Sequence, residues 1–247
     1  MVRRWLSRAM LLATALSLLP CLPSTARASW ATDGNLVVGP SSAAATPRLV
    51  PNTMGGVYLA WIDARTGYNT DIRASLWTAA GVAASGWTRD GDLVTNVTCA
   101  KYDLCAVPDG AGGALYAWSD NRCVGYQQVY ARRVVAAGAT AAGWAANGVR
   151  LASTGSNQFT PAITGDGASG AFVAWQDRRG VDADIYLQHV DGTGAVVTGW
   201  PATGLGIAVV TGVQSAPAAM SDGAGGVFVT WQDGRAGNAH DISAGVR

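Results

Sequence analysis

The sequence contains no glutamate, and Lys101 is its single lysine. All 16 acidic residues are aspartates, and charged residues make up only 13% of the chain. Glutamate and lysine usually cover the surface of helices, so this composition argues against helical bundles and coiled coils. Because 17 basic residues stand against 16 acidic ones, no charge excess indicates nucleic acid or an acidic membrane as a partner.

Long apolar stretches are missing outside the N-terminus. There, three arginines precede an apolar run over residues 9–19, and the small-residue pattern Ala-Arg-Ala follows at 26–28. This order is typical of a signal peptide, which we predict over residues 1–28. No later stretch approaches about 18 uninterrupted apolar residues, so we expect no membrane span and a secreted or periplasmic protein.

Tryptophan and glycine are abundant, and the tryptophans recur at fixed spacing. One series is separated by 57, 57 and 56 residues, and each member has Asp two and Arg four positions later, here called the W-x-D-x-R box. The boxes are Trp61, Asp63 and Arg65; Trp118, Asp120 and Arg122; Trp175, Asp177 and Arg179; and Trp231, Asp233 and Arg235. The second series, each followed four residues later by Gly, is Trp30, Trp87, Trp144 and Trp200. Two series in one register indicate four repeats of about 57 residues within 29–247.

Each repeat is predicted to form four short strands. The first begins near Pro47 or its equivalents Leu104, Pro161 and Pro217, and ends at a Gly-rich turn such as VPDGAGG. The second is a nearly continuous apolar run (GVYLAW, GALYAW, GAFVAW, GVFVTW), which indicates burial on both faces. The third opens with sequences such as DIYL, and the fourth contains the second tryptophan and its glycine. Four-stranded units at this period predict an all-β protein, a β-propeller.

The two ends of the chain carry complementary parts of a repeat. The mature sequence starts with a fourth-strand segment, GNLVV, and stops after a third strand. We therefore predict four blades of four antiparallel strands, closed by the N-terminal strand in a monomer. The alternative is a piece of a larger propeller with six to eight blades.

The motifs DG-x-x-G, W-x-D-x-R and D-I-Y at 184–186 resemble the propeller repeats of secreted bacterial proteins. The layout is similar to TolB-type repeats and, more loosely, to the Asp-box repeats of sialidases. It departs from the first in carrying Trp before Asp, and from the second in lacking the S-x-D-x-G-x-x-W order. The resemblance implies the fold and transfers no activity, because propellers serve binding, scaffolding and catalysis.

The box residues recur in every repeat, which favours a structural role over a single active site. Trp, Asp and Arg at spacing two share one face of a strand, so Asp can accept a charge-assisted hydrogen bond from Arg or a backbone amide. An acid at the start of the third strand, Asp71, Asp184 or Asp241, is a further expected partner, with Gln128 in its place in the second repeat. A ligand-binding ring, or a cation on the axis, is the alternative.

Catalytic signatures are weak. A glycosidase would need two aspartates in different environments, because glutamate is absent. His189 and His240 lie in no metal-ligand spacing and near no G-x-S-x-G sequence, which argues against zinc and serine-hydrolase chemistry. We assign no catalytic residue, no metal and no cofactor.

Three aromatic residues are candidates for contact with a ligand. Trp77 lies where the other repeats have no tryptophan, and Tyr68 and Tyr126 lie in turns between second and third strands. They are candidates for binding a carbohydrate or a protein, although for Trp77 packing is favoured over this role.

Export permits disulfides, and the three cysteines of the mature chain fall in or beside the second repeat. If the hairpin turns near Ala111, Cys123 comes opposite Cys99, and Cys105 remains unpaired inside a strand. We predict a Cys99–Cys123 disulfide, with Cys99–Cys105 as the alternative.

These patterns favour a non-enzymatic propeller that binds a glycan, a surface polymer or a protein through rim loops. A hydrolase or lyase of extracellular polysaccharide that uses Asp residues, and a module that assembles with other chains, are the alternatives. An enzyme should break its repeat in one place with additional polar residues.

Overall fold

The structure is a computed structural model that describes residues 30–39, 43–122, 125–235 and 241–246. The predicted signal peptide, Cys123 and His240 lie outside these ranges. In the described ranges, no helix has the length and apolar character needed to cross a membrane.

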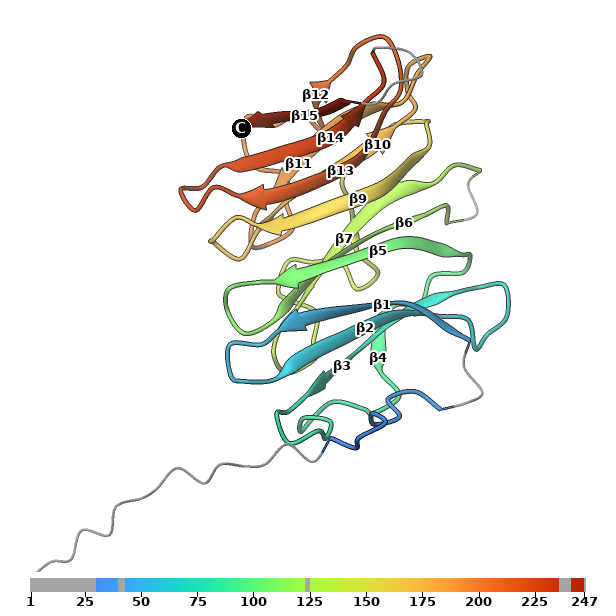
Figure 1. Cartoon of the computed structure of the whole chain (residues 1–247), viewed down its shortest axis with the longest axis vertical. Coiled ribbons are helices and arrows are strands. Elements are labelled where there is room, and N and C mark those ends of the chain that lie inside the picture. The colour runs from blue at the N-terminus through green and yellow to red at the C-terminus, as the bar shows by residue number, and fades with distance from the viewer. Residues whose placement is uncertain (1–29, 40–42, 123–124, 236–240, 247) are drawn as a thin grey trace, which may run out of the picture.

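The strands form four antiparallel sheets in chain order, each folding as an up-and-down meander (Figure 1). The first blade consists of β1 (Ala44–Pro51), β2 (Val57–Asp63), β3 (Asp71–Trp77) and β4 (Asp92–Thr95). The second consists of β5 (Lys101–Pro108), β6 (Ala114–Asp120), β7 (Gln128–Val134) and β8 (Val149–Arg150). The third consists of β9 (Gln158–Gly165), β10 (Ala171–Asp177), β11 (Asp184–Val190) and β12 (Leu205–Ala208). The fourth consists of β13 (Gln214–Ser221), β14 (Val227–Asp233) and β15 (Asp241–Val246). The predicted all-β propeller-type architecture is confirmed.

The first and fourth strands of the repeats begin at residues other than those predicted. The first strands begin three residues earlier than expected and contain a bulge in register. A residue of positive φ lies in each bulge: Thr46, Asp103, Thr160 and Ala216. The fourth strands begin after the periodic glycine, so the second tryptophans lie in the preceding turn. The apolar pattern locates a strand, whereas backbone pairing decides where it begins.

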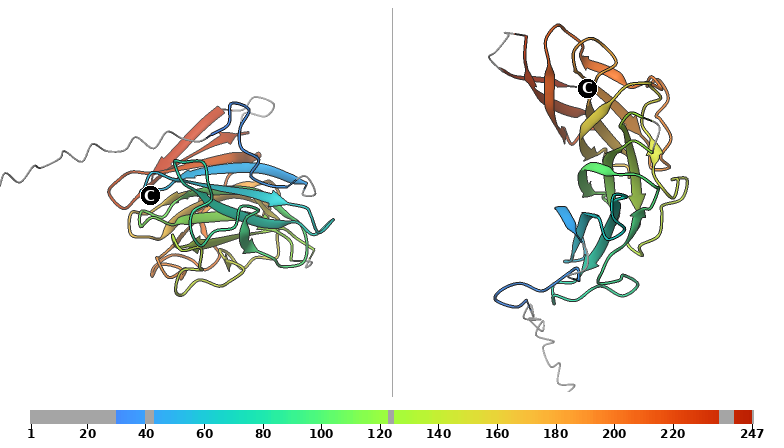
Figure 2. Two further views of the ribbon diagram at one scale, coloured as in Figure 1. Left: turned by 90° about the horizontal axis from the view of Figure 1, so that it is seen from below. Right: turned by 90° about the vertical axis from the view of Figure 1, so that its right-hand side faces the viewer.

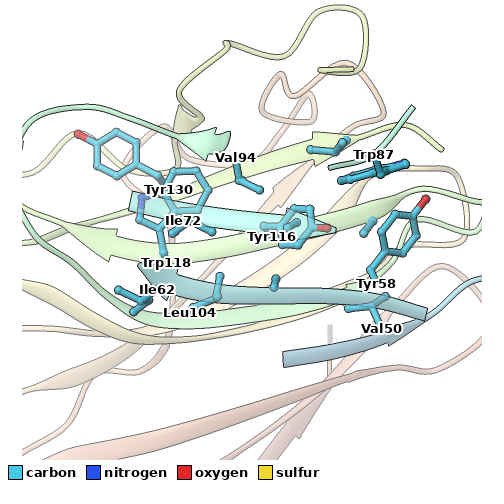
Figure 3. Close-up of a cluster of buried hydrophobic side chains, with 14 residues drawn as sticks. Val50, Tyr58, Ile62, Ile72, Trp87, Val94, Leu104, Tyr116, Trp118 and Tyr130 are labelled. Atoms are coloured by element: carbon cyan, nitrogen blue, oxygen red, sulfur yellow. The ribbon is translucent and has the colours of Figure 1, made fainter. Parts of the chain in front are cut away.

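Three apolar clusters join neighbouring blades. Between the first two blades, Tyr58 and Ile72 from one sheet pack with Tyr116 and Trp118 from the next (Figure 3). Equivalent clusters join the second blade to the third and the third to the fourth. Every residue of β6 and β10 is buried, which agrees with burial on both faces. The core therefore consists of layers between sheets.

The predicted closure by the N-terminal strand is wrong for this structure. The inner strands β1, β5, β9 and β13 lie side by side in that order, and the sheets form a curved stack with the first and fourth blades at its ends (Figure 2). Described residues 30–39 contain no strand. They lie on the first blade, where Asn35 Nδ2 donates to Gly81 O (3.0 Å). Because these contacts hold the segment at one end of the stack, it does not pair with β15 at the other end.

Candidate functional site

One rim of the stack carries the loops from second to third strands and the loops that lead from one blade to the next. Each W-x-D-x-R box lies where a second strand ends, so its arginine stands at the start of a rim loop. Alternation along the strand places Trp and Asp of a box on the same face, which brings the indole to the carboxylate.

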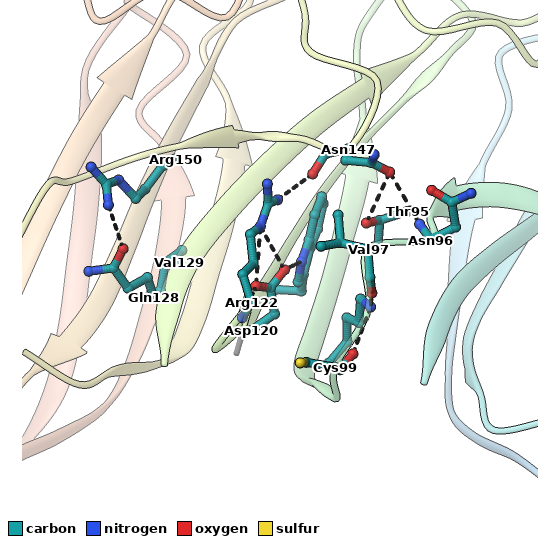
Figure 4. A network of polar contacts seen from close by, with 12 residues as sticks. Thr95, Asn96, Val97, Cys99, Asp120, Arg122, Gln128, Val129, Asn147 and Arg150 are labelled. Carbon is teal, nitrogen blue, oxygen red and sulfur yellow. Dashed lines mark hydrogen bonds and ion pairs between the residues drawn. The ribbon is translucent and has the colours of Figure 1, made fainter. Parts of the chain in front are cut away.

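In the second blade, Trp118 Nε1 donates to Asp120 Oδ2 (2.8 Å), and the Arg122 amide donates to Asp120 Oδ1 (3.1 Å). The Arg122 guanidinium donates to Asp120 and to the carbonyl of Asn147 (Figure 4). The other boxes form the same indole and amide bonds to their aspartates. Each box thus satisfies its own buried carboxylate.

The periodic glycines lie against the box tryptophans. A Cβ on Gly148 would stand 2.4 Å from the Trp118 ring, and Gly91 and Gly204 approach Trp61 and Trp175 equally closely. The φ of Gly148 is 83°, a region that favours glycine. The two periodic series of the sequence therefore meet in one contact.

The pKa values of three box aspartates, Asp63, Asp177 and Asp233, lie below the ordinary value. Burial by itself would raise the pKa of Asp63, but hydrogen bonds from Arg65 and Trp61 outweigh it and lower the pKa to about 2. The same balance, with Arg179 and Trp175 as donors, lowers the pKa of Asp177. A carboxyl that stays ionised and fully bonded is a poor general acid.

The acids that begin the third strands stand directly opposite the box aspartates. The opposed pairs are Asp63 with Asp71, Asp177 with Asp184, and Asp233 with Asp241, while Asp120 faces Gln128. Burial raises the pKa of Asp71 and Asp184. The described hydrogen bonds of Arg65 go to Asp63 and to a backbone carbonyl, not to the expected partner Asp71.

A cavity of about 510 Å³ opens on the rim between the second and third blades. Its lining residues are Tyr126, Gly155, Ser156, Asn157, Arg178 and Arg179. Asn157 Oδ1 accepts from the Gln127 amide (2.9 Å), and Ser156 Oγ donates to Asp177 Oδ1 (2.9 Å). These bonds tie the wall between the blades to the box of the third blade.

Arg178 is the lining residue that departs most from the repeat. The equivalent positions hold Ala64, Asn121 and Gly234. Its side chain is exposed, and its guanidinium lies 5.4 Å from the centre of the Phe159 ring. No carboxylate in the described part of the chain forms a salt bridge with it, whereas neighbouring Arg179 is bonded to Asp177 (2.6 Å). Arg178 therefore offers, at the cavity, a guanidinium that no carboxylate of the described residues neutralises.

One aromatic side chain of the inner strands, Phe159, lies beside this arginine. Phe159 on β9 is half-buried, and Tyr102 occupies the equivalent position of β5 and is 39% exposed. The first and fourth blades have Ala45 and Ser215 there. The sequence analysis missed Arg178, Asn157 and Phe159, although comparison of the repeats position by position contains the signal.

The three aromatic candidates from the sequence have different surroundings. Tyr126 lines the cavity and is partly exposed, and Tyr68 is fully exposed on the rim of the first blade. Trp77 is only 3% exposed and packs against Trp30, with 5.8 Å between ring centres. The hypothesis of an exposed stacking role for Trp77 is therefore wrong, because the N-terminal segment covers it.

The structure describes two of the three cysteines considered for the predicted disulfide. Cys99 is buried, but its expected partner Cys123 lies outside the described residues, so this disulfide stays a prediction. Cys105 has a free thiol, which argues against the Cys99–Cys105 alternative. Burial raises the pKa of the Cys105 thiol to about 12, which disfavours the reactive thiolate. In the described ranges no cluster of three or more His, Cys, Asp or Glu could hold a metal ion.

No protein-family model matches the chain, and no curated protein matches it. Several solved structures match this chain. A protein of unknown function from Dyadobacter fermentans matches at a TM-score of 0.54 and 14% identity, over 85% of this chain and 67% of the other. The Hadza microbial sialidase Hz136 matches at 0.51 and 11% identity, over 81% and 43%.

An α-L-arabinanase of Penicillium chrysogenum, complexed with arabinobiose, matches at a TM-score of 0.45 and 14% identity, over 81% of this chain and 64% of that one. At such identities the likeness is one of fold. The chain spans less than half of the sialidase and about two thirds of the other two.

Proposed function

We propose that the protein binds an acidic carbohydrate chain, outside the cytoplasm, in the rim cavity between the second and third blades. The observation that carries the proposal is the Arg178 guanidinium, which lines the cavity, forms no salt bridge with a described carboxylate and has no arginine equivalent in the other repeats. Residues that recur in every blade have structural partners, so a single ligand site is expected where the repeats differ.

The chemistry of the lining suits a sugar that carries a carboxylate. A guanidinium binds carboxylates with two parallel hydrogen bonds. Tyr126 offers a ring face and a hydroxyl, and Asn157 lies beside it with an amide side chain. Aromatic rings pack on the apolar faces of sugars, while amides and hydroxyls bond to sugar hydroxyl groups.

The structural comparisons support the class of ligand. One structurally similar protein is named as a sialidase, and sialic acid is an acidic sugar. That likeness extends to the fold alone, so the proposal rests on Arg178 and its surroundings.

Binding is favoured over hydrolysis by the side chains at the cavity. Its described lining residues include two arginines and no acid, whereas glycoside hydrolysis uses a pair of carboxyl groups. The export that the proposal assumes depends on the predicted signal peptide over residues 1–28.

A polysaccharide hydrolase or lyase is the second candidate function. The position of Asp184 in another rim cavity is the observation that favours it. Asp182 and Asp184 line a smaller rim cavity of about 380 Å³, and burial raises the pKa of Asp184. Both carboxylates also accept backbone amides, from Gly212 (3.0 Å) and Val210 (3.2 Å). These bonds give the pair a structural role in shaping the loop, which ranks catalysis second.

Glycan-array binding followed by calorimetry tests the first proposal. We expect uronate- or sialate-bearing oligosaccharides to bind and their neutral counterparts to bind at least about tenfold more weakly, a difference of 1.4 kcal/mol. Arg178→Ala should abolish this preference, and Arg178→Lys should restore part of it. Arg48→Ala is the matched control, because Arg48 is exposed on β1 and its described side-chain bond goes to Pro47 O. Equal binding of acidic and neutral glycans, or equal effects of the two alanine variants, would contradict the proposal.

A further inference from the structure

Each blade has two faces that differ in their neighbours. The face toward the next blade carries Tyr58 and Ile72 in the first blade, and the face toward the preceding blade carries Tyr116 and Trp118 in the second. We call these the following face and the preceding face. The same alternation repeats at the second and third junctions, so every junction joins a following face to a preceding face.

The following face of the fourth blade is uncovered. Phe228 is 42% exposed, whereas its equivalents Tyr58, Leu115 and Phe172 are at most 2% exposed. Ile242 on β15 is 75% exposed, whereas its equivalents Ile72, Val129 and Ile185 are fully buried. The fourth blade thus presents apolar side chains of the kind that the other blades bury in a junction.

The preceding face of the first blade is only partly covered. Leu49 is 67% exposed, whereas its equivalent Ile163 is 6% exposed. A cavity of about 210 Å³ lies on this face, and its walls include Val37, Val38, Leu59 and Trp61. The two ends of the stack therefore present the two halves of one junction.

Residues 30–38 already lie where the outer strand of a preceding blade would be. At the first two junctions, the tryptophan before the outer strand donates to the next blade: Trp87 Nε1 to Ala136 O (2.9 Å) and Trp144 Nε1 to Gly192 O (3.0 Å). Trp30 is the repeat equivalent of these residues, and it packs on Trp77 of the first blade. The described pairing of β15 is with β14 alone.

We propose that two copies of this chain associate head to tail, with β15 of each copy pairing with residues 30–38 of the other. The first and fourth blades of one copy lie at opposite ends of its curved stack (Figure 2), which separates the complementary faces within a chain. Between two copies the same faces can meet twice, as in a heterologous interface that closes. The result is a ring of about eight blades, within the range that propellers use.

The register follows from the first blade. There, Ile72 pairs with Thr95, and Arg73 pairs with Leu93. By the repeat, Ser243 of one copy should lie opposite Leu36 of the other. Pairing would cover Ile242 and remove an open sheet edge, which proteins rarely leave bare.

Mixing two variants, each with one added cysteine, tests this register. Ser243→Cys and Leu36→Cys, mixed and oxidised, should form a covalent dimer on a non-reducing gel, and neither variant alone should form it. Val181→Cys, at an exposed rim position, replaces Leu36→Cys in the control mixture. If the chain instead closes on itself, the mixture gives no covalent dimer, while a double Ser243→Cys/Leu36→Cys chain gives an internal crosslink; this result overturns the proposal.

Mass measurement of charge variants provides an independent test. By light scattering, the unchanged protein should have twice the mass of one chain, and Phe228→Asp or Leu49→Asp alone should have the mass of one chain with an unchanged circular dichroism spectrum. A mixture of the two variants keeps one intact junction and should regain the double mass, whereas Val181→Asp should leave the mass unchanged. A single-chain mass for the unchanged protein at about 100 µM would refute the association.

Discussion

The third and fourth blades contain nearly the same second strand in different surroundings. β10 reads AFVAWQD and is buried throughout, whereas β14 reads VFVTWQD and alternates between buried and exposed residues. β10 lies between two sheets and β14 has a sheet on one side only. The burial of a strand in these blades therefore depends on the neighbouring sheets as much as on its own apolar residues.

Removal of a phenylalanine from the following faces should show this difference most strongly. Phe172→Ala should lower the free energy of unfolding by about 3–5 kcal/mol, the usual cost of removing a buried Phe. Phe228→Ala should cost clearly less in separate chains, because Phe228 is 42% exposed and Phe172 is 2% exposed. Urea titrations of both variants measure the difference, and equal losses would mean that the fourth blade is covered in solution, as the head-to-tail association requires.

Glycines of the second series should be intolerant of a methyl group. Gly148→Ala places Cβ against the Trp118 ring and should cost about 1–3 kcal/mol more than Gly110→Ala through overpacking. Gly110 is the matched control, because its φ is also positive and nothing lies within 4 Å of its added Cβ. Thermal melts measure the loss of melting temperature in both variants. Equal losses would show that backbone strain, and not the tryptophan contact, requires glycine at position 148.

The boxes should differ with the exposure of their arginines. Asp177→Asn should lower stability by about 1–2 kcal/mol, because it weakens bonds to Arg179 and to a buried indole. Asp233→Asn should have a smaller effect, since the side chain of Arg235 is 55% exposed against 22% for Arg179. Chemical denaturation of both variants checks this order, and a stable Asp177→Asn protein that loses glycan binding would move that box into the binding site.

Acid should weaken the boxes in a defined range of pH. The pKa of Asp63 is about 2 in the folded protein against 3.8 as its ordinary value. A lowered folded pKa means that its contribution is complete above about pH 4 and is lost as the pH falls toward 2. The melting temperature should therefore fall over this range, and by less in Asp63→Asn. An equal fall in both proteins would assign the acid sensitivity to other carboxylates.

Much of the fold follows from the repeats. The period, the strand content and the residues of the boxes could all be predicted from the sequence, because equivalent positions have equivalent neighbours inside the stack. The contact between Gly148 and Trp118 was not, since two series in register do not reveal which members touch. The partner that buries Trp77 was also not predicted, because it is Trp30, which lies 47 residues earlier in the chain.

By itself, the sequence determined the blades: their number, their strands and their box hydrogen bonds depend on local pattern and on alternation along a strand. Tertiary structure decided how the blades follow one another, that residues 30–38 lie on the first blade, and that Arg178 stands beside Phe159 at a cavity between blades. The physical reason is distance along the chain. Interactions within a repeat join residues close in sequence, whereas the curvature of the stack and the cavity arise from the sum of packing between whole sheets.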